Sequence, residues 1–368
     1  MNLQKNNTSL KILTVVGARP QFIKCANLSK HIKEHHSSEI NEIIVHTGQH
    51  YDENMSKLLF RELKIPYPKF NLGINKVNQG AMVGRMIEGL EKICLSENPD
   101  WVIVYGDTNS TLAAAIVASK LKIKLAHVES GLRSYNMCMP EEVNRVLTDR
   151  VSTLLFCPTK NAVKNLVKEG FENFSNVNII NVGDIMYDAV LNFSDMSKQP
   201  ILSFNAKNVE YILVTLHRTE ITSNKKKLLS VLSALNKINE STRVVAPFHP
   251  RTVKAIDEFQ ISVNFDVISP VSYLEMLWLI QNSKLVITDS GGLQKEAFFL
   301  KKISLIAREE TEWVELLQSS NSILVGYDKN KIIEEYKKTG NFNPTPNLFG
   351  EGNTSEQIIN SIINYSKT

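Results

Sequence analysis

Residues 285–297 read LVITDSGGLQKEA, and this stretch decides the fold that we expect for the chain. Its first four residues are apolar or β-branched without alternation, which is typical of a strand buried on both faces. Asp289, Ser290 and two glycines then turn the chain into a helical pattern. A buried strand, a glycine-rich turn and a helix in this order predict part of a parallel sheet that helices cover.

The same alternation of apolar runs and amphipathic helical stretches recurs along the whole chain. Six runs precede residue 184: KILTVV (11–16), EIIVHT (42–47), WVIVY (101–105), KLAHV (124–128), LLFC (154–157) and NIINVG (178–183). Six more follow residue 200: YILVTL (211–216), RVVA (243–246), FDVI (265–268), LVIT (285–288), ISLIA (303–307) and SILVG (322–326). We therefore expect an α/β protein with two Rossmann-like, doubly wound domains. Such domains bind ligands beyond the carboxyl ends of their strands, so the two domains are expected to face a common cleft.

The domain boundary is predicted within residues 184–200, which end in small polar residues and a proline. We place the N-terminal domain at residues 1–185 and the C-terminal domain at residues 200–353. A last helical pattern, near residues 354–368, is expected to pack back on the first domain. The length of 368 residues is sufficient for two domains with one core each.

Composition argues against several classes of partner. The formal net charge is +4 and the pI is near 8.7, which suits an anionic small ligand. The one basic run, Lys225–Lys227, begins a predicted helix and is interpreted as a solvated face, so nucleic acid is not expected. The four cysteines form no Cys-x-x-Cys pair. A polar N-terminus and the lack of an apolar run of roughly 20 residues predict a cytoplasmic chain without a membrane partner.

Charged residues gather where the predicted strands of the first domain end. The run KILTVV leads into GARPQFIK, where Arg19 and Lys24 lie at or near a helix N-terminus, a favourable place for a phosphate. Both residues are equally compatible with ordinary surface cations. The run WVIVY leads into GDTNST, where Asp107 is either the N-cap of the next helix or a carboxylate of the site.

The next strand end adds three more carboxylates. KLAHV places Glu129 at the same sheet edge, and a helix begins near Glu141 and Glu142. Arg145 lies one turn after Glu141 and is able to pair with it. One of the two helical glutamates is expected to be a helix-start charge, and the other to point into the cleft. Carboxylates that converge in this way perturb each other's pKa values, which suits general acid–base chemistry.

The second domain offers a diphosphate site after LVIT. Ser290 provides a hydroxyl, and Gly291 and Gly292 let a ligand approach the free N–H groups of the following helix. Glu296 is placed to accept hydrogen bonds from ribose hydroxyls. A glycine-rich turn without a ligand is the alternative.

Two histidines follow strands of the second domain. His217 comes directly after YILVTL and is expected to face the cleft, although a structural role is open. His249, in PFHPR, is a weaker candidate for the same cleft. There is no G-x-G-x-x-G after the first strand and no Walker A motif, so neither NAD nor ATP is indicated.

Ten motifs of the chain resemble, in order, those of the non-hydrolysing UDP-N-acetylglucosamine 2-epimerase family. They read GARPQFIK, HTGQHYD, GDTNST, HVESGLRS, MPEEVNR, VGD, TLHRTE, SPVSYLEM, TDSGGLQKEA and REETEWVE, and they span nearly the whole chain. No single motif is decisive, but ten in the same order are specific. The resemblance implies a GT-B-like fold of two domains, usually in a homodimer. It also implies interconversion of UDP-GlcNAc and UDP-ManNAc for cell-surface polysaccharide synthesis.

The resemblance also implies roles for particular residues. By motif position, the catalytic residues correspond to Asp107, Glu129, Glu141 and His217. The nucleotide-sugar contacts correspond to Arg19, Lys24, Met276, Ser290, Gly291, Gly292 and Glu296. The resemblance implies a UDP-sugar substrate, no metal and no other cofactor.

The chain departs from the family pattern at two places. Many relatives read TERPE where this chain reads TEWVE, so an arginine that contacts the nucleotide has no counterpart at Trp313. Arg308 is a candidate replacement. Relatives often have Gln and Phe where this chain has Val271 and Met276, although backbone contacts and packing against the base can survive there.

Other functions are compatible with the same motifs. Some relatives bind a second UDP-GlcNAc as an activator near the motif that reads Gln49-His50 here. A hydrolysing epimerase would release the free sugar, and a GT-B glycosyltransferase would need an acceptor groove. An epimerase for a related UDP-sugar, with diacetamido or deoxy substitution, is a further alternative.

Overall fold

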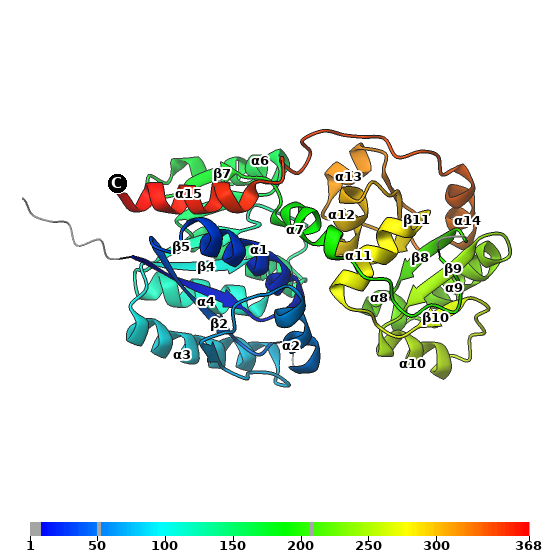
Figure 1. Ribbon diagram of the computed structural model, residues 1–368, viewed down its shortest axis with the longest axis horizontal. Helices are drawn as coiled ribbons and strands as arrows, with labels where there is room; N and C mark the ends of the chain where they lie inside the picture. Colours follow the sequence, from blue (N-terminus) through cyan, green and yellow to red (C-terminus); the bar gives the residue numbers. More distant parts are fainter. Residues whose placement is uncertain (1–8, 50–52, 207–208, 368) are drawn as a thin grey trace, which may run out of the picture. The chain divides into compact units, whose positions relative to one another are not determined.

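The computed structural model describes residues 9–49, 53–206 and 209–367, which form two compact units. The N-terminal unit holds the described residues up to Ala189 and those from Asn347 onward. The C-terminal unit holds Val190–Pro346. Each unit is a parallel sheet covered by helices, so the predicted α/β class with two doubly wound sheets is confirmed (Figure 1).

The sheet of the N-terminal unit has the order β3-β2-β1-β4-β5-β6-β7, and every pairing is parallel. The strands are β1 Leu10–Val16, β2 Ile40–His46, β3 Phe70–Asn71, β4 Trp101–Tyr105, β5 Lys124–Val128, β6 Leu154–Cys157 and β7 Asn178–Asn181. The helices are α1 Arg19–His35, α2 Glu53–Glu62, α3 Gln79–Glu97, α4 Asn109–Lys120, α5 Pro140–Val151, α6 Lys160–Lys168, the 3-10 helix η1 Phe171–Asn173, α7 Ile185–Phe193 and α15 Thr354–Lys367. The strand order reverses between β1 and β4, which is where such sheets bind ligands.

The sheet of the C-terminal unit has the order β10-β9-β8-β11-β12-β13, again parallel throughout. Its strands are β8 Tyr211–Thr215, β9 Arg243–Pro247, β10 Asp266–Ile268, β11 Leu285–Thr288, β12 Ser304–Ile306 and β13 Ser322–Leu324. Its helices are the 3-10 helix η2 Ser194–Met196, α8 Thr219–Thr222, α9 Lys225–Asn239, α10 Pro250–Glu258, α11 Tyr273–Asn282, α12 Gly291–Phe299, α13 Val314–Gln318 and α14 Lys329–Lys338. Here the order reverses between β8 and β11.

The central strands are buried because helices cover both faces of each sheet. All five residues of β4 are at most 1% exposed, and Tyr211 to Val214 of β8 are 0% exposed. This burial explains why the strands appear in the sequence as continuous apolar runs. It also leaves the loops at the strand ends as the places where polar side chains can act.

Two segments differ from the sequence-based expectation. The helix α3 was not predicted, although Met86, Leu90, Ile93 and Cys94 have helical spacing and are buried against the sheet. The predicted boundary region is largely helical, since α7 and η2 occupy residues 185–196. The limit between the two compact units falls inside α7, between Ala189 and Val190.

The last helix, α15, belongs to the N-terminal unit and packs against α1 (Figure 1). Its apolar face is fully buried at Ile358, Ile359 and Ile362. Its N-terminus is capped by the Asp188 carboxylate, which accepts hydrogen bonds from the N–H groups of residues 354 and 355 at 3.1 and 2.8 Å. Burial of an amphipathic face and a charged cap together fix this helix on the unit.

Replacing Ile359 by Ala should destabilise the chain by about 2–4 kcal/mol, because the buried methylenes are lost and a cavity remains. The matched control is Ile201→Ala, since Ile201 is 97% exposed and its loss should change the free energy of unfolding by less than about 0.5 kcal/mol. Urea unfolding of the full chain measures both values. Equal effects of the two substitutions would contradict the burial of α15.

Candidate active site

The loops after β1, β2 and β4 meet around Gly17. A Cβ atom at Gly17 would overlap the hydroxyl groups of Ser110 and Thr47. Only glycine therefore fits at this position. The Ser110 hydroxyl is 2.8 Å from the Thr47 hydroxyl and donates to Gln49 Oε1 at 2.8 Å. Gln49 therefore supports the β4 loop, whereas its neighbour in the predicted activator motif, His50, lies outside the described residues.

Gln21 connects the loop after β1 to the loop after β4, and sequence reasoning missed it. Its Oε1 atom accepts hydrogen bonds from the N–H groups of Gly17 and Ala18 at 2.8 and 3.0 Å. Its Nε2 atom donates to the Tyr105 carbonyl at 2.8 Å and to the Thr111 hydroxyl at 2.9 Å. The side chain is buried, and its four hydrogen bonds hold the β1 and β4 ends in fixed register. The motif GARPQFIK contained it, but no pattern in the sequence indicated its partners.

Lys24 and Glu129 form an ion pair at the edge of the sheet. Lys24 Nζ contacts Glu129 Oε2, and only 6% and 11% of the two side chains is exposed. Glu129 directly follows β5 and has a φ of 72°, a conformation that strains a residue with a side chain. Both groups border Gly106, where an added Cβ would lie 3.1 Å from Glu129 Oε2 and 3.5 Å from Lys24 Nζ. Arg19, at the start of α1, is partly exposed.

Arg145 binds two carboxylates of the site. Its guanidinium contacts the Asp107 carboxylate, with Nε 3.1 Å from Oδ2, and its Nη1 atom is 2.7 Å from Glu142 Oε2. Asn144 donates to the Asp107 carbonyl at 2.9 Å. The Asp107 side chain remains 30% exposed, so it is held on one side and open on another.

Asp107 is not the N-cap of α4. The cap is Thr108, whose hydroxyl accepts a hydrogen bond from the Thr111 N–H at 3.3 Å. Of the two roles that the sequence left open for Asp107, capping is therefore excluded.

Glu141 and Glu142 have different surroundings. The Glu142 carboxylate is buried and accepts three hydrogen bonds at 2.9 Å, two from Ser134 and one from the Tyr135 N–H. Arg145, which the spacing also allowed to pair with Glu141, pairs with the next residue, Glu142. Glu141 is exposed in the first turn of α5. Residues three apart lie on one face of a helix, as residues four apart do, so the spacing allowed either glutamate, and the buried one is the partner of Arg145.

The pKa of Glu142 lies below its ordinary value. Burial alone would raise this pKa, but the hydrogen bonds from Ser134 and Tyr135 and the charge of Arg145 outweigh it. Glu142 is therefore ionised at neutral pH, and its carboxylate holds the loop at residues 134–135.

In the C-terminal unit, Asp289 organises the ends of β8 and β11. Its carboxylate is fully buried and accepts hydrogen bonds from the N–H groups of His217 and Arg218 at 2.7 and 2.8 Å. The His217 ring nitrogen Nδ1 lies 2.9 Å from Asp289 Oδ1, while about half of the side chain is exposed. The sequence indicated no role for Asp289, because its partners His217 and Arg218 follow β8, 72 and 71 residues earlier in the chain.

The predicted diphosphate turn is the N-terminus of α12. Ser290 is the N-cap and accepts a hydrogen bond from the Leu293 N–H at 3.4 Å, and its own N–H donates to the Thr288 hydroxyl at 2.9 Å. A Cβ atom at Gly291 would overlap the Glu312 carboxylate, whereas Gly292 has no atom within 4 Å of such a position. Close packing against Glu312 therefore requires glycine at position 291, whereas the space in front of Gly292 is open.

Trp313 covers a buried lysine of α12. Lys295 is 2% exposed, and its Nζ atom lies 3.9 Å from the centre of the Trp313 ring, a close cation–π contact. Arg308, the candidate replacement for the missing arginine, pairs with Glu312 at 2.9 Å. This loop thus keeps two cations near Gly291, although neither stands at position 313.

The other candidates of this unit lie as follows. Glu296 is 7% exposed on α12, and Met276 of α11 is partly buried against a core cluster that includes Val271. His249 is the N-cap of α10, where its Nδ1 atom accepts a hydrogen bond from the Arg251 N–H at 3.2 Å. Burial, and then the charges of Arg251 and His217, lower the pKa of His249.

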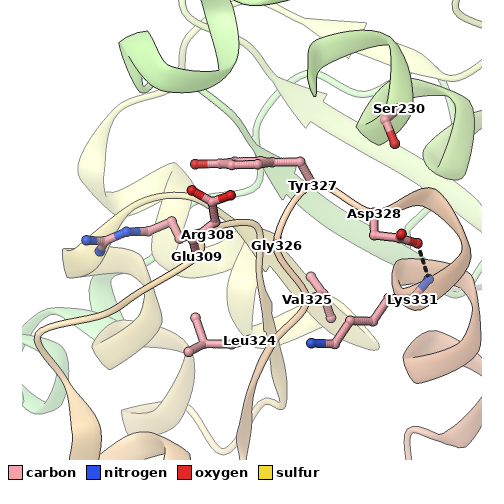
Figure 2. A pocket seen from close by; sticks show the side chains of 9 residues that line it. All are labelled: Ser230, Arg308, Glu309, Leu324, Val325, Gly326, Tyr327, Asp328 and Lys331. Carbon is pink, nitrogen blue, oxygen red and sulfur yellow. Dashed lines mark hydrogen bonds between the residues drawn. The ribbon is translucent and has the colours of Figure 1, made fainter. Parts of the chain in front are cut away.

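An open pocket of about 550 Å³ lies where β12 and β13 end, next to α9 and α14 (Figure 2). Arg308, Glu309, Tyr327 and Lys331 are among the residues that line it. Arg308, the candidate replacement for the missing arginine, thus faces this pocket, whereas the catalytic and nucleotide-sugar candidates are not among its lining residues. In the part of the chain that the structure describes, no group of three or more His, Cys, Asp or Glu is arranged to hold a metal ion. No helix in residues 9–49, 53–206 or 209–367 is long and apolar enough to cross a membrane.

Comparison with known proteins decides the family. The family model of UDP-N-acetylglucosamine 2-epimerase matches residues 31–363. The chain belongs to this family. Within it, the chain is 48% identical over 352 residues to the UDP-2,3-diacetamido-2,3-dideoxy-D-glucuronate 2-epimerase of Pseudomonas aeruginosa, with 95% of this chain and 98% of the relative covered. It is 41% identical to the UDP-N-acetylglucosamine 2-epimerase of Methanocaldococcus jannaschii, with 97% and 100% covered.

Solved structures agree with this membership. The crystal structure of the M. jannaschii enzyme in complex with UDP-GlcNAc and UDP has a TM-score of 0.84 at 39% identity, with 97% of this chain and 100% of that chain covered. The Neisseria meningitidis enzyme bound to UDP-GlcNAc has a TM-score of 0.86 at 29% identity, with 96% and 100% covered. The family member described here is therefore a GT-B-like isomerase of the UDP-sugar 2-epimerase kind.

Replacing Glu142 by Gln should lower the free energy of unfolding by about 2–4 kcal/mol at neutral pH, because Arg145 loses a buried partner. Glu141→Gln, one residue earlier and exposed, should leave it within about 0.5 kcal/mol. Because the pKa of Glu142 is lowered in the folded chain, its contribution is present above the ordinary glutamate pKa and lost as pH falls through the folded value. The difference between wild type and Glu142→Gln should therefore shrink below about pH 4. Urea unfolding across this pH range measures it, and a pH-independent difference would contradict the assignment.

Proposed function

We propose that this family member interconverts UDP-GlcNAc and UDP-ManNAc by elimination and re-addition of UDP, without hydrolysis. One observation carries the proposal. In a chain of this family, the loops after β4 and β5 hold Asp107 and Glu129 beside cations, and the turn after β11 presents the N-terminus of α12 at Ser290. The first arrangement suits a developing cation on a sugar, and the second suits a leaving diphosphate.

The chemistry explains why UDP must leave. The C2 proton of the sugar is not adjacent to a carbonyl, so direct removal is difficult. When the bond from C1 to the diphosphate oxygen breaks, positive charge develops at C1 and the C2 proton becomes acidic. Loss of this proton gives 2-acetamidoglucal and UDP. Addition of a proton to the opposite face of C2, and of UDP to C1, gives the epimer.

The residues of the N-terminal unit would stabilise and relay charge. Asp107, Glu129 and Glu141 supply negative charge for the oxocarbenium-like transition state and sites for the proton. The fixed pairs of Asp107 with Arg145 and of Glu129 with Lys24 support this role, because preoriented charges need no reorganisation during the reaction.

The residues of the C-terminal unit would hold UDP. The N–H groups at the start of α12 and the Ser290 hydroxyl suit the diphosphate, and Glu296 suits the ribose. His217, aligned by Asp289, suits a hydrogen bond to the diphosphate or to a substrate oxygen. Arg19 and Lys24 would add positive charge for the leaving group, and Met276 would pack near the base.

A second candidate substrate is a UDP-linked 2,3-diacetamido sugar acid. The 48% identity to the P. aeruginosa enzyme favours it. The elimination is the same for both sugars, because it involves only C1 and C2. We further propose a cytoplasmic homodimer that serves cell-surface polysaccharide synthesis. Free sugar release would instead indicate a hydrolysing epimerase, and acceptor-dependent turnover a glycosyltransferase.

Incubation of the enzyme with UDP-GlcNAc in D₂O, without added metal or NAD, should introduce deuterium at C2 of both epimers. The reason is that the C2 proton exchanges with solvent during the elimination. Proton NMR measures the exchange, and the same assay on UDP-2,3-diacetamido-glucuronate compares the two candidate substrates. Full retention of protium on every UDP-sugar tried would rule out the proposal.

Asp107→Asn and Gly292→Ala should separate turnover from UDP binding. Asp107→Asn should reduce kcat about 10²–10⁴-fold but leave UDP affinity near that of wild type, because the carboxylate acts on the sugar. Gly292→Ala should fold normally, since a Cβ there meets no protein atom within 4 Å, but should weaken UDP binding about tenfold or more by standing before the helix N–H groups. Calorimetry with UDP and a coupled turnover assay give both values. If Asp107→Asn lost UDP binding as well, or Gly292→Ala bound UDP normally, these roles would be wrong.

A further inference from the structure

His127 is buried beneath the candidate catalytic edge, between two groups that accept hydrogen bonds. It lies on β5, and its side chain is 0% exposed. The ring nitrogen Nδ1 is 2.7 Å from Asp149 Oδ1, and the ring nitrogen Nε2 is 2.7 Å from the carbonyl oxygen of Gly106. A neutral imidazole has one N–H donor and one acceptor nitrogen, so it can satisfy only one of these two partners unless Asp149 is itself protonated.

The surroundings of Asp149 argue against a protonated carboxyl group. Its other oxygen, Oδ2, is 2.7 Å from Arg133 Nη1 and accepts a hydrogen bond from the Gly131 N–H at 3.2 Å. A guanidinium at this distance stabilises the ionised form.

A second carboxylate lies beyond Arg133. Glu169 binds Arg133, with Nε 2.6 Å from Oε1 and Nη2 2.9 Å from Oε2, and Arg150, whose side chain is 40% exposed, lies 3.9 Å from Glu169 Oε2. Arg150 therefore also offsets Glu169, and Asp149 is the carboxylate that faces both His127 and Arg133. The Cys157 thiol, on the neighbouring strand, adds no charge because burial raises its pKa to about 12. A fully buried carboxylate is costly unless donors satisfy both of its oxygens, which Arg133 and a protonated Nδ1 atom of His127 do here.

On its other side, the ring holds the turn that carries Asp107. Gly106 has a φ of 60°, its N–H donates to the Val128 carbonyl at 2.9 Å, and its carbonyl points to His127. Lys24 and Glu129 border the same glycine. The carbonyl of Gly106 belongs to the peptide bond that leads into Asp107, so its orientation sets the direction in which the Asp107 side chain leaves the backbone.

We propose that His127 is a buried imidazolium, with a proton on both ring nitrogens, and that it is a positioning residue for Asp107. This inference rests on the proposed function for the role of Asp107 but not for the protonation of the ring. A charge-assisted hydrogen bond to a carbonyl is about twice as strong as a neutral one, so the charge fixes the Gly106–Asp107 turn more firmly than a neutral ring does. Asp149 keeps the charge in place, and Arg133 holds Asp149.

Nitrogen-15 NMR of the full chain, labelled in its eight histidines, tests the protonation directly. At neutral pH one ring should show two protonated nitrogens with slowly exchanging protons, and His127→Gln should remove this signal. Asp149→Asn should convert the ring to the neutral form, with one unprotonated nitrogen, because the amide of Asn can donate to Nδ1. A wild-type spectrum with no such buried imidazolium overturns the proposal, whether or not either variant folds.

Kinetics test the positioning role. Asp149→Asn should lower kcat about tenfold to a hundredfold, with KM and UDP affinity changed less than about twofold, because a misplaced catalytic group affects the chemical step. The matched control is Glu169→Gln, which removes a carboxylate from the same cluster without touching His127 and should keep kcat within about twofold. Normal kcat in Asp149→Asn, or an equal loss in Glu169→Gln, overturns the positioning role. A wild type that epimerises no UDP-sugar refutes the proposed function instead, and an active wild type with a neutral His127 refutes only this inference.

Discussion

Parallel strand pairing is the constraint on which the rest of the structure depends. Every strand of each sheet points the same way, so all loops that follow strands collect at one edge of the unit. The strand order reverses between β1 and β4 and between β8 and β11, and the flanking loops diverge at these points. Helices cover the faces, which leaves this edge as the place where backbone N–H groups and polar side chains remain available. Within each unit, this topology therefore brings together candidate residues from loops that are far apart in sequence.

Placing several carboxylates at one edge creates an electrostatic problem, which the N-terminal unit solves by pairing. Lys24 pairs with Glu129, and Arg145 joins Asp107 to Glu142. A half-buried carboxylate without a partner would be protonated or would destabilise the fold. The pairs keep the carboxylates ionised and aimed, and they also reduce the freedom of each side chain. Stability and the proposed function therefore have the same cause, since the contacts that make the charges tolerable would also hold them in place for a cationic transition state.

The sequence predicted the fold more completely than the contacts of the site. Continuous apolar runs identify strands because burial on both faces leaves no alternation, and the motif at 285–297 identified the start of α12. The helix α3 was missed, although Met86, Leu90 and Ile93 have helical spacing, because β3, the strand before it, has only two residues and gives no apolar run in the sequence. The choice of Glu142 over Glu141 as the partner of Arg145 depends on a helical phase that spacing alone leaves ambiguous.

The side chains that sequence reasoning overlooked share a feature. Gln21 and Asp289 bond to backbone groups of other strands, and their partners are 84 and 72 residues away. No local pattern encodes such partners, because they follow only from strand order and register. Neither residue contacts a reacting atom in the proposed chemistry. Both hold strand-end loops that carry the proposed catalytic and binding residues, so their role follows only from the folded structure.

The same reasoning explains how relatives with different sugars can share this edge. Loss of UDP and of the C2 proton involves C1 and C2 alone, and the proposed carboxylates and the α12 turn serve only these atoms and the diphosphate. Substituents at C3 and C6 take no part in bond breaking, so they place no demand on these residues. Substrate choice must then depend on side chains outside the strand-end motifs, where sequences of the family are free to differ. The ten motifs of this chain therefore argue for the reaction and not for one particular sugar.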